Sequence, residues 1–469
     1  MRRRLGGWTA GAVALTVVMV VLVVTALQSP TGIVAPPAGA VLPAPTASLP
    51  GYRPGAGAEL SQRAASGSAQ ALFVKSPGGV PATAARVARF RPLIDAAVRG
   101  TDIPPVLLEG LVFLESAGRP YAVAGGSVQD AAGLTQILPS TGSSVLGLHI
   151  DLARSGPLLA AAEAAQSAGA TRRLARLNAQ LARADQRFDP ARALAGTVRY
   201  LLIAERDLGR LDLGVAAYHA GIGNIQTVLD DYDRGRPVSF AQVYFDTAPN
   251  RHPAAWSFLS QLGDDSSLYL WRVLEAERLM QMYRSQPGAL RRLSGLETGY
   301  PSDALALLGP TIQPFSGPAA LSAAYQSGAL VPLPRDPSRL HLTYAPDMGV
   351  LARRWHVPVS LYRGLRPAAL AVLLRVAAAV HGLAGGTLSV TSAVLDRRYQ
   401  SLLGYVDPPG ATGFTFQILR HYSPAAQAPA LQFVLDRLQA LDLIGWLRGS
   451  RTIEVTVAPD AAQVLRSKP

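Results

Sequence analysis

The sequence predicts a mainly α-helical domain, followed by a smaller α+β domain and preceded by an apolar N-terminal segment. Apolar residues recur at helical spacing, with capping residues between the repeats, over residues 84–295. From residue 331 onward, helical stretches alternate with segments rich in β-branched residues, which are typical of strands. The length of 469 residues allows two or three domains, and a hydrophobic content of 49% is enough to fill their cores.

The N-terminal part has the composition of a membrane-targeting segment and a linker. Three arginines precede an uncharged run that is most apolar over residues 10–27, so we expect residues 1–27 to be a signal anchor or a signal peptide. No small-residue cleavage site follows at once, which favours a retained anchor with an exported remainder. Residues 28–83 are rich in proline, alanine, glycine and serine, and we expect them to form a flexible linker.

The charge and the absence of cysteine exclude some classes of protein. The formal net charge of +13 comes almost entirely from arginines scattered along the chain. No aromatic residues alternate with basic ones, so we expect no nucleic-acid partner; an anionic polymer outside the cytoplasm or a membrane surface fits the charge better. Without cysteine, the chain forms neither disulfide bonds nor a lipid-modified N-terminal cysteine.

One predicted helix, which ends near Gly118, carries an acid at the end of its apolar face. The apolar positions and the acid are spaced i, i+3, i+4 and i+7: Leu108, Leu111, Val112 and Glu115. Burial at this position would raise the pKa of the carboxyl group and suit it to donate a proton as a general acid. The alternative is that Glu115 lies at a frayed helix end and meets water. Glu109 points to another face, where we expect it to be solvated.

Four further motifs follow Glu115 and Ser116 in a fixed order. They are Ser127; Gly-Leu-Thr-Gln-Ile-Leu-Pro-Ser-Thr at 133–141; Asp-Pro-Ala-Arg-Ala-Leu-Ala-Gly with Tyr-Leu at 189–201; and Ala-Tyr-His-Ala-Gly-Ile-Gly-Asn at 217–224, with Tyr269 before a late helix. In this order the motifs resemble the soluble lytic transglycosylases, whose catalytic domain has the goose-type lysozyme fold. The resemblance covers roughly residues 87–283. It departs from the family at Thr135, where the family has methionine, and at His219, where it has asparagine.

The resemblance implies a function and a set of site residues. Glu115 would be the single acid and base that cleaves the β-1,4 bond between N-acetylmuramic acid and N-acetylglucosamine of peptidoglycan and leaves a 1,6-anhydro end. No cofactor or metal is implied, and the location would be the periplasmic side of the bacterial inner membrane. The residues that would hold the glycan are Ser127, Gln136, Tyr218, Asn224 and Tyr269. Structural roles remain open for three of them: Asn224 as a helix cap, Tyr218 as a core residue and Ser127 as a loop residue.

Two other functions remain open, and one insertion is unexplained. Hydrolysis can replace cyclisation, with Asp130 positioning a water molecule, or the chain can be a non-catalytic cell-wall-binding assembly protein whose altered Thr135 and His219 mark a disused site. Residues 154–187, which typical family members lack, predict a helical hairpin rich in alanine, arginine and leucine. The hairpin would be an arm that binds a protein partner or a surface ornament.

The C-terminal residues 331–469 predict an α+β domain, joined to the first domain by a connection over residues 296–330. We expect helices over residues 362–381 and 430–443 and strands over residues 388–392 and 452–457.

The order of these elements faintly resembles the zinc D,D-carboxypeptidase-like fold. The family's ligand positions would fall on Gly410, Gln417 and Glu454. Zinc needs three histidine or carboxylate ligands, and this set offers at most one. We therefore expect a metal-free domain that serves as a scaffold or binds a protein partner.

Overall fold

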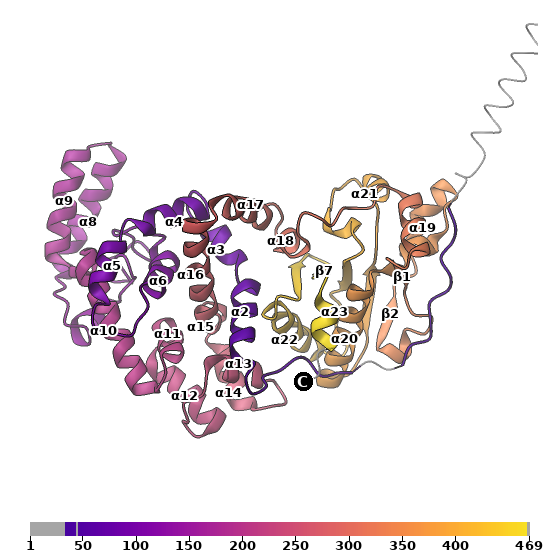
Figure 1. Cartoon of the computed structure of the whole chain (residues 1–469), viewed down its shortest axis with the longest axis horizontal. Coiled ribbons are helices and arrows are strands. Elements are labelled where there is room, and N and C mark those ends of the chain that lie inside the picture. Colours follow the sequence, from indigo (N-terminus) through magenta and orange to yellow (C-terminus); the bar gives the residue numbers. More distant parts are fainter. Residues whose placement is uncertain (1–32, 44–45, 467–469) are drawn as a thin grey trace, which may run out of the picture.

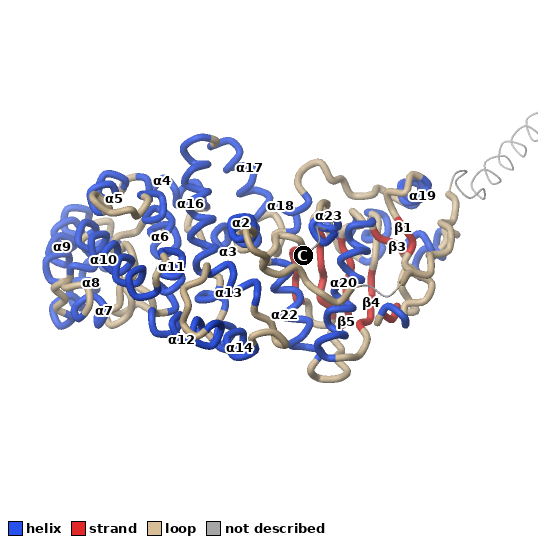
Figure 2. The backbone as a smooth tube through the Cα atoms, turned by 60° about the horizontal axis from the view of Figure 1, so that its bottom comes forward, coloured by secondary structure: helices blue, strands red, loops and turns tan. Residues whose placement is uncertain are grey.

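The computed structural model describes residues 33–43 and 46–466, and these form two lobes that lie side by side (Figure 1). The chain is mainly helical with a small sheet region, as the sequence predicts. A helical lobe comprises residues 57–297, and a sheet lobe comprises residues 304–466; the strands are confined to the sheet lobe (Figure 2). The segment expected to be an anchor, residues 1–27, lies outside the described residues.

The helical lobe is built around one buried helix, α16. The bounds in this lobe are α2 (Gly57–Gly67), α3 (Gln70–Lys75), α4 (Val80–Ala88), α5 (Arg91–Ala97), α6 (Pro105–Ser116), α7 (Pro139–Ser144), α8 (Leu152–Ser167), α9 (Thr171–Ala184), η1 (Gln186–Phe188), α10 (Pro190–Leu208), α11 (Leu211–Ala220), α12 (Ile222–Asp233), α13 (Phe240–Asp246), α14 (Pro253–Gln261), α15 (Asp264–Ser267), α16 (Tyr269–Ser285) and α17 (Pro287–Glu297). Helix α16 packs against α2, α4, α6 and α17. It buries apolar residues toward these neighbours, among them Trp271, Val273, Leu279 and Met280.

The expectation of a flexible linker over residues 28–83 is wrong for its second half. Residues 57–83 form α2, α3 and the start of α4, and they bury Leu60, Leu72, Phe73 and Val80 in the core of the helical lobe. Alanine and serine fill the gaps between these anchors, so the composition resembles that of a linker. Alanine is nevertheless the best helix former, and a few buried residues are enough to dock short helices of this kind.

The first half of the expected linker is extended and lies along the sheet lobe. The Val34 amide donates to Ser322 Oγ at 2.9 Å, and Arg375 donates a hydrogen bond to the Ser48 carbonyl. The described part of residues 33–56 therefore forms a strap that runs beside the sheet lobe before the chain enters α2 (Figure 1).

The insertion at residues 154–187 folds as the antiparallel pair α8 and α9, which projects from the far end of the helical lobe (Figure 1). Asp151 caps α8 by accepting a hydrogen bond from the Arg154 amide at 3.0 Å. The exposed face of α9 carries several arginines, and its inner face buries Leu181.

The sheet lobe has a five-stranded sheet with the order β2-β4-β5-β7-β6. Strands β2 and β4 are parallel and the other pairs are antiparallel. The bounds are α18 (Ala304–Leu308), α19 (Pro318–Gln326), β1 (Val331–Pro332), η2 (Ser338–Leu340), β2 (Leu342–Tyr344), η3 (Val350–Trp355), η4 (Val359–Tyr362), β3 (Gly364–Leu365), α20 (Pro367–Ala384), β4 (Leu388–Ser392), α21 (Arg397–Leu403), η5 (Pro409–Ala411), β5 (Thr415–Leu419), α22 (Gln427–Gln439), β6 (Ile444–Arg448), β7 (Thr452–Val457) and α23 (Ala461–Arg466). The two strands expected from the sequence coincide with β4 and β7.

Among the described residues, α20 is the one helix long and apolar enough to cross a membrane. Half of it is buried, and it packs against β5, β7, α22 and α23. Its apolar composition is therefore explained by its place as the core helix of the sheet lobe.

The connection expected over residues 296–330 is folded onto the sheet lobe. Helix α18 lies against the edge strand β6, where a side chain on Gly445 would collide with Asp303. Buried residues of both lobes belong to one continuous apolar cluster. The two lobes therefore pack directly against each other.

Candidate functional site

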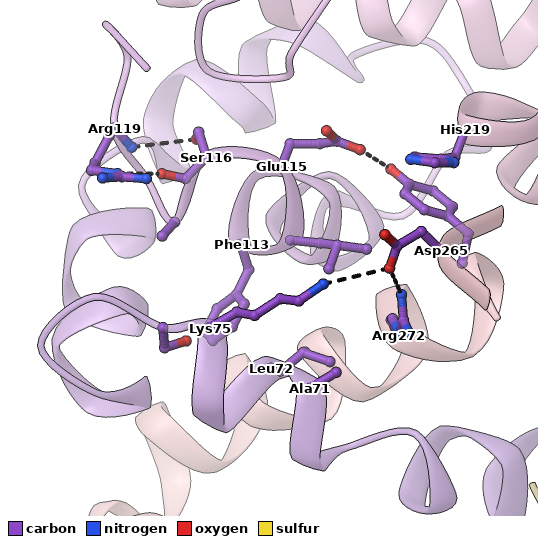
Figure 3. Close-up of a pocket in the computed structure, with 14 residues that line it drawn as sticks. Ala71, Leu72, Lys75, Phe113, Glu115, Ser116, Arg119, His219, Asp265 and Arg272 are labelled. Atoms are coloured by element: carbon purple, nitrogen blue, oxygen red, sulfur yellow. Dashed lines mark hydrogen bonds and ion pairs between the residues drawn. The ribbon is translucent and has the colours of Figure 1, made fainter. Parts of the chain in front are cut away.

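The site forms where α6 ends and α16 begins. These two helices run antiparallel and in close contact, because Gly110 lets the helix axes approach: a Cβ atom there would lie 2.8 Å from the Val273 carbonyl oxygen of α16. Gly118, with φ of +72°, then turns the chain sharply after α6. The geometry brings Glu115, in the last turn of α6, to Tyr269, the first residue of α16 (Figure 3).

Glu115 is half-buried and has one strong polar contact. The Tyr269 hydroxyl donates a hydrogen bond to Glu115 Oε1. Burial raises the pKa of Glu115 from 4.5 to about 7, and the tyrosine hydrogen bond opposes part of that rise. Within the described chain, no cation pairs with Glu115 and its other oxygen accepts no hydrogen bond. The carboxyl group is therefore able to hold a proton near neutral pH and has an oxygen free to transfer it.

Aromatic rings stack beside Glu115 and restrict the position of its hydrogen-bond donor, Tyr269. The rings of Tyr218 and Tyr269 stack at 6.2 Å, and the His219 ring lies over Tyr269 at 5.3 Å. The Tyr218 hydroxyl donates to the Thr135 carbonyl at 2.8 Å, so it is anchored to the loop that carries the second motif. Burial, with Glu115 nearby, raises the pKa of both tyrosines. Both hydroxyls therefore stay protonated and act as donors.

The acid opens into a pocket of about 230 Å³. One side comes from α3 and includes Ala71, Leu72 and Lys75, and the adjoining side carries Asp265 and Arg272 (Figure 3). Asp265 accepts from Lys75 Nζ at 3.5 Å and from Arg272, and the Arg272 hydrogen bond lowers the pKa of its carboxyl group. The pocket therefore holds one acid that can exchange its proton near neutral pH and one carboxylate that stays ionised.

His219 also lines this pocket. Its Nδ1 is 2.9 Å from Ser266 Oγ, and burial lowers the pKa of the imidazole. A neutral ring stacked on Tyr269 adds no charge beside Glu115.

The residues predicted from the sequence divide into two groups. Glu115, Tyr218 and Tyr269 lie together. The other three have local backbone partners and do not line the pocket: Ser127 Oγ accepts from the Gln129 amide at 3.1 Å, Gln136 Nε2 donates to the Ala122 carbonyl at 3.0 Å and the Gly133 carbonyl at 2.9 Å, and Asn224 Nδ2 donates to the Ala220 carbonyl at 2.7 Å. Asn224 lies inside α12 and is not its N-cap.

The loop with Ser127 and Gln136 is held in place by Arg187, a residue that the sequence reasoning missed. Arg187 is fully buried beside Asp185 and donates to the carbonyls of Val128 at 2.7 Å and Asp130 at 2.8 Å. Arg187 follows directly after the helical hairpin, so the base of the hairpin and the loop form one unit. An arginine two residues before the capping Asp189 gave no local signal of this role.

The expectation that Glu109 is solvated is wrong. Its side chain is fully buried and accepts from Arg284 at 2.8 Å and from Arg91 at 3.5 Å. Glu109 faces α16 and α5, and both cations come from segments distant in the sequence. Two carboxylates on one helix thus have different environments: Glu109 is neutralised by arginines, whereas Glu115 has none.

A second cluster lies in the sheet lobe, at the positions where a zinc site was considered. Gln417 pairs with Glu454 across β5 and β7, with Gln417 Nε2 3.1 Å from Glu454 Oε2. The Tyr300 hydroxyl oxygen lies 2.7 Å from Glu454 Oε1 and 3.0 Å from Asp407 Oδ1, and its one proton is donated within this cluster. No group of three histidine or acidic side chains placed to hold a metal occurs among the described residues.

Comparisons with protein families, with curated proteins and with solved structures found no match. The arrangement around Glu115 suits proton transfer to a leaving oxygen followed by return of the proton from an attacking hydroxyl, since a single group with a pKa near 7 serves both steps.

Proposed function

We propose that this chain is a peptidoglycan lytic transglycosylase that cleaves the β-1,4 bond between N-acetylmuramic acid and N-acetylglucosamine. The observation that carries the proposal is Glu115: a half-buried acid with a pKa raised to about 7, no cationic partner in the described chain, and a free oxygen at an open pocket. The order of the motifs around it, which resembles that of the soluble lytic transglycosylases, supports the same reaction and a goose-type lysozyme fold for the helical lobe.

The reaction uses Glu115 twice. The protonated carboxyl donates its proton to the glycosidic oxygen as the bond from that oxygen to C1 of the muramyl residue breaks. The carboxylate then takes the proton of the C6 hydroxyl as the C6 oxygen bonds to C1 and closes the 1,6-anhydro ring. Glu115 ends in its starting state, and no water is consumed.

Tyr269 and its neighbours position the acid. The Tyr269 hydroxyl holds one carboxyl oxygen, which leaves the other oxygen for proton transfer. The neighbouring Tyr218 and His219 rings both stack against Tyr269 and restrict its position. Such a rigid support matters because general acid catalysis depends on a short donor distance to the leaving oxygen.

A hydrolytic reaction is the second candidate, and Asp265 is the observation that favours it. Glycosidases commonly use two carboxyl groups that face one substrate, one protonated and one ionised. Asp265 lines the same pocket as Glu115, and its lowered pKa keeps it ionised. Asp130, the helper considered from the sequence, does not line this pocket.

The location follows from the substrate. Peptidoglycan lies outside the cytoplasmic membrane, so the chain acts on the periplasmic side, with residues 1–27 as anchor or signal.

The test is mass spectrometry of the products that the purified chain releases from peptidoglycan sacculi. Muropeptides with 1,6-anhydro ends support the proposal. Reducing muramic acid ends would replace it with a hydrolase, and a chain that binds sacculi without releasing muropeptides would be a cell-wall-binding protein.

A further inference from the structure

A groove of about 900 Å³ lies between the two lobes, next to the Glu115 pocket. Its walls come from α2, α3 and α14 of the helical lobe and from α22 and β6 of the sheet lobe. Helices α2 and α14 of the helical lobe lie on the side that meets α22 of the sheet lobe (Figures 1 and 2). Ligand sites occur preferentially at such interfaces, and their volumes are roughly 300 to 1,000 Å³.

The groove and the pocket share part of their lining. Ala71, Lys75 and Arg272 belong to both, and the ion pairs that Lys75 and Arg272 make with Asp265 stand between the two spaces. Lys75 and Asp265 are 69% and 65% exposed, so this divider is a solvated surface contact. A chain-like ligand that enters the pocket can therefore continue into the groove.

The lining of the groove has the chemistry of a carbohydrate site. Trp256, Phe433 and Trp446 present aromatic rings, against which the apolar C–H faces of sugar rings pack. Gln70 and Gln432 lie among them and provide amide groups that pair with hydroxyl and N-acetyl groups.

Three donor nitrogens of the groove lining lack an acceptor among the described residues. They are Gln70 Nε2, Arg272 Nε and Trp446 Nε1, and all three are covered by neighbouring atoms. An unpaired covered donor is destabilising, so a small side-chain rotation toward a ligand carbonyl would be favourable. Acceptor-rich N-acetyl sugars supply such carbonyls.

The charges of the groove match an acidic polymer. Lys75, Arg272, Arg437 and Arg448 outnumber Asp264 and Asp436. Peptidoglycan carries carboxylates on its stem peptides, whereas the sugar rings themselves are neutral. The sign of the charge and the aromatic rings therefore fit the two parts of the same polymer.

The volumes of the Glu115 pocket and the interlobe groove indicate different roles. The Glu115 pocket, at about 230 Å³, is below the usual range for a ligand site, so it holds only the part of a polymer at the cleaved bond. Binding energy from remote parts of a substrate is what positions the reacting centre.

We propose that the interlobe groove binds the glycan strand of peptidoglycan beyond the cleaved bond, so that the sheet lobe is a part of the substrate-binding surface. The inference rests on the proposed function. It assigns the sheet lobe, which has no metal-binding cluster among its described residues, a role in holding long strands.

The experiment measures oligosaccharide binding by calorimetry with the full chain carrying Glu115→Gln, which prevents turnover. The probes are β-1,4-linked N-acetylglucosamine oligomers of three and of six sugars. Adding Trp446→Ala or Trp256→Ala should weaken binding of the six-sugar oligomer by about three- to tenfold, the range of one lost aromatic contact, and change binding of the three-sugar oligomer by less than about twofold. Trp355→Phe, a tryptophan packed on Tyr399 away from the groove, is the matched control.

Gln432→Ala is a second variant, at a half-buried polar position of α22 that lines the groove and contributes no apolar side chain to the core, and thermal melting verifies the fold of each protein. Binding of the six-sugar oligomer that is equal in all variants overturns the inference. If sacculi are cleaved in a Glu115-dependent manner while the groove variants bind normally, only this inference fails. If sacculi are not cleaved and no oligomer binds, the proposed function fails with it.

Discussion

The two lobes each contain a glutamate whose pKa is raised to about 7 and which accepts a hydrogen bond from a tyrosine. In the helical lobe, Glu115 keeps one oxygen free and lines an open pocket. In the sheet lobe, both oxygens of Glu454 are occupied, one by Tyr300 and the other by Gln417. Burial is the main cause of the raised pKa in both cases.

The difference shows that a raised pKa alone does not identify a catalytic acid. Burial raises the pKa of any carboxyl group, whether the group is catalytic or has only a structural role. Catalysis also needs an oxygen that can reach the substrate. By that criterion Glu115 qualifies, and Glu454 is a structural residue that links β7 to the connection from the helical lobe.

The largest expected effect separates the two glutamates. Glu115→Gln keeps the shape of the side chain and removes its proton exchange, so turnover of peptidoglycan should fall by at least ~100-fold, the low end of the contribution of general acid–base catalysis. Glu454→Gln should leave turnover within about twofold, since no proton transfer passes through it. Dye release from labelled sacculi measures the turnover of both variants. Equal losses of turnover in the two would contradict the assignment of Glu115 as the acid and Glu454 as a structural residue.

The third glutamate of the comparison, Glu109, should affect stability and not catalysis. Glu109→Gln leaves Arg284 and Arg91 without their buried partner, and because these arginines are 39% and 40% exposed we expect a loss of about 2 kcal/mol, below the 3 to 5 kcal/mol of a fully buried pair. Chemical denaturation measures this loss. Activity per folded molecule should stay unchanged; a variant that melts normally but is inactive would place Glu109 in the catalytic machinery.

The tyrosine partners should shift the pH dependence in one lobe only. In the proposed mechanism Glu115 starts protonated, so activity should fall as the pH rises through about 7. The Tyr269 hydrogen bond favours the ionised carboxylate, so Tyr269→Phe should raise the pKa of Glu115 and move this decline to higher pH. Tyr300→Phe is the matched control, and its pH profile should be that of the wild type. If the pH profile of activity shifts with Tyr300→Phe and not with Tyr269→Phe, the catalytic acid is Glu454 in the sheet lobe.

The smallest expected effect is that of a chelator. Gln417 and Glu454 pair across β5 and β7, and the Gly410 amide donates to Asp407; the three expected positions thus offer one carboxylate and no histidine, too few ligands for zinc. The full chain should therefore melt at the same temperature with and without chelator, since no metal contributes folding energy. Stoichiometric zinc in the purified protein, together with a lowered melting temperature after chelation, would contradict this prediction.

The sequence predicted what local patterns encode. The stripe that ends at Glu115, the capping Asp189 and the alternation of β7 depend on neighbours within a few residues, and the structure has these elements at those positions. The hairpin of α8 and α9 is also local, because a short turn joins two helices of similar length.

Contacts between residues distant in the chain could not be predicted from local sequence patterns. Glu109 was expected to meet water because its cations, Arg284 and Arg91, come from segments that local periodicity does not connect. Helix α3 was taken for linker, yet Leu72 and Lys75 line the pocket. Asp265 was overlooked because an exposed acid in a short helix has no distinguishing local pattern.

The most direct test of the account is peptidoglycan digestion in water enriched in oxygen-18, with mass spectrometry of the released muropeptides. If Glu115 transfers the C6 proton and closes the anhydro ring, the new ends contain no oxygen from water, and the products have the same mass in labelled and ordinary water. Incorporation of one labelled oxygen at each new muramic acid end would show that water is the nucleophile, and would contradict the central claim.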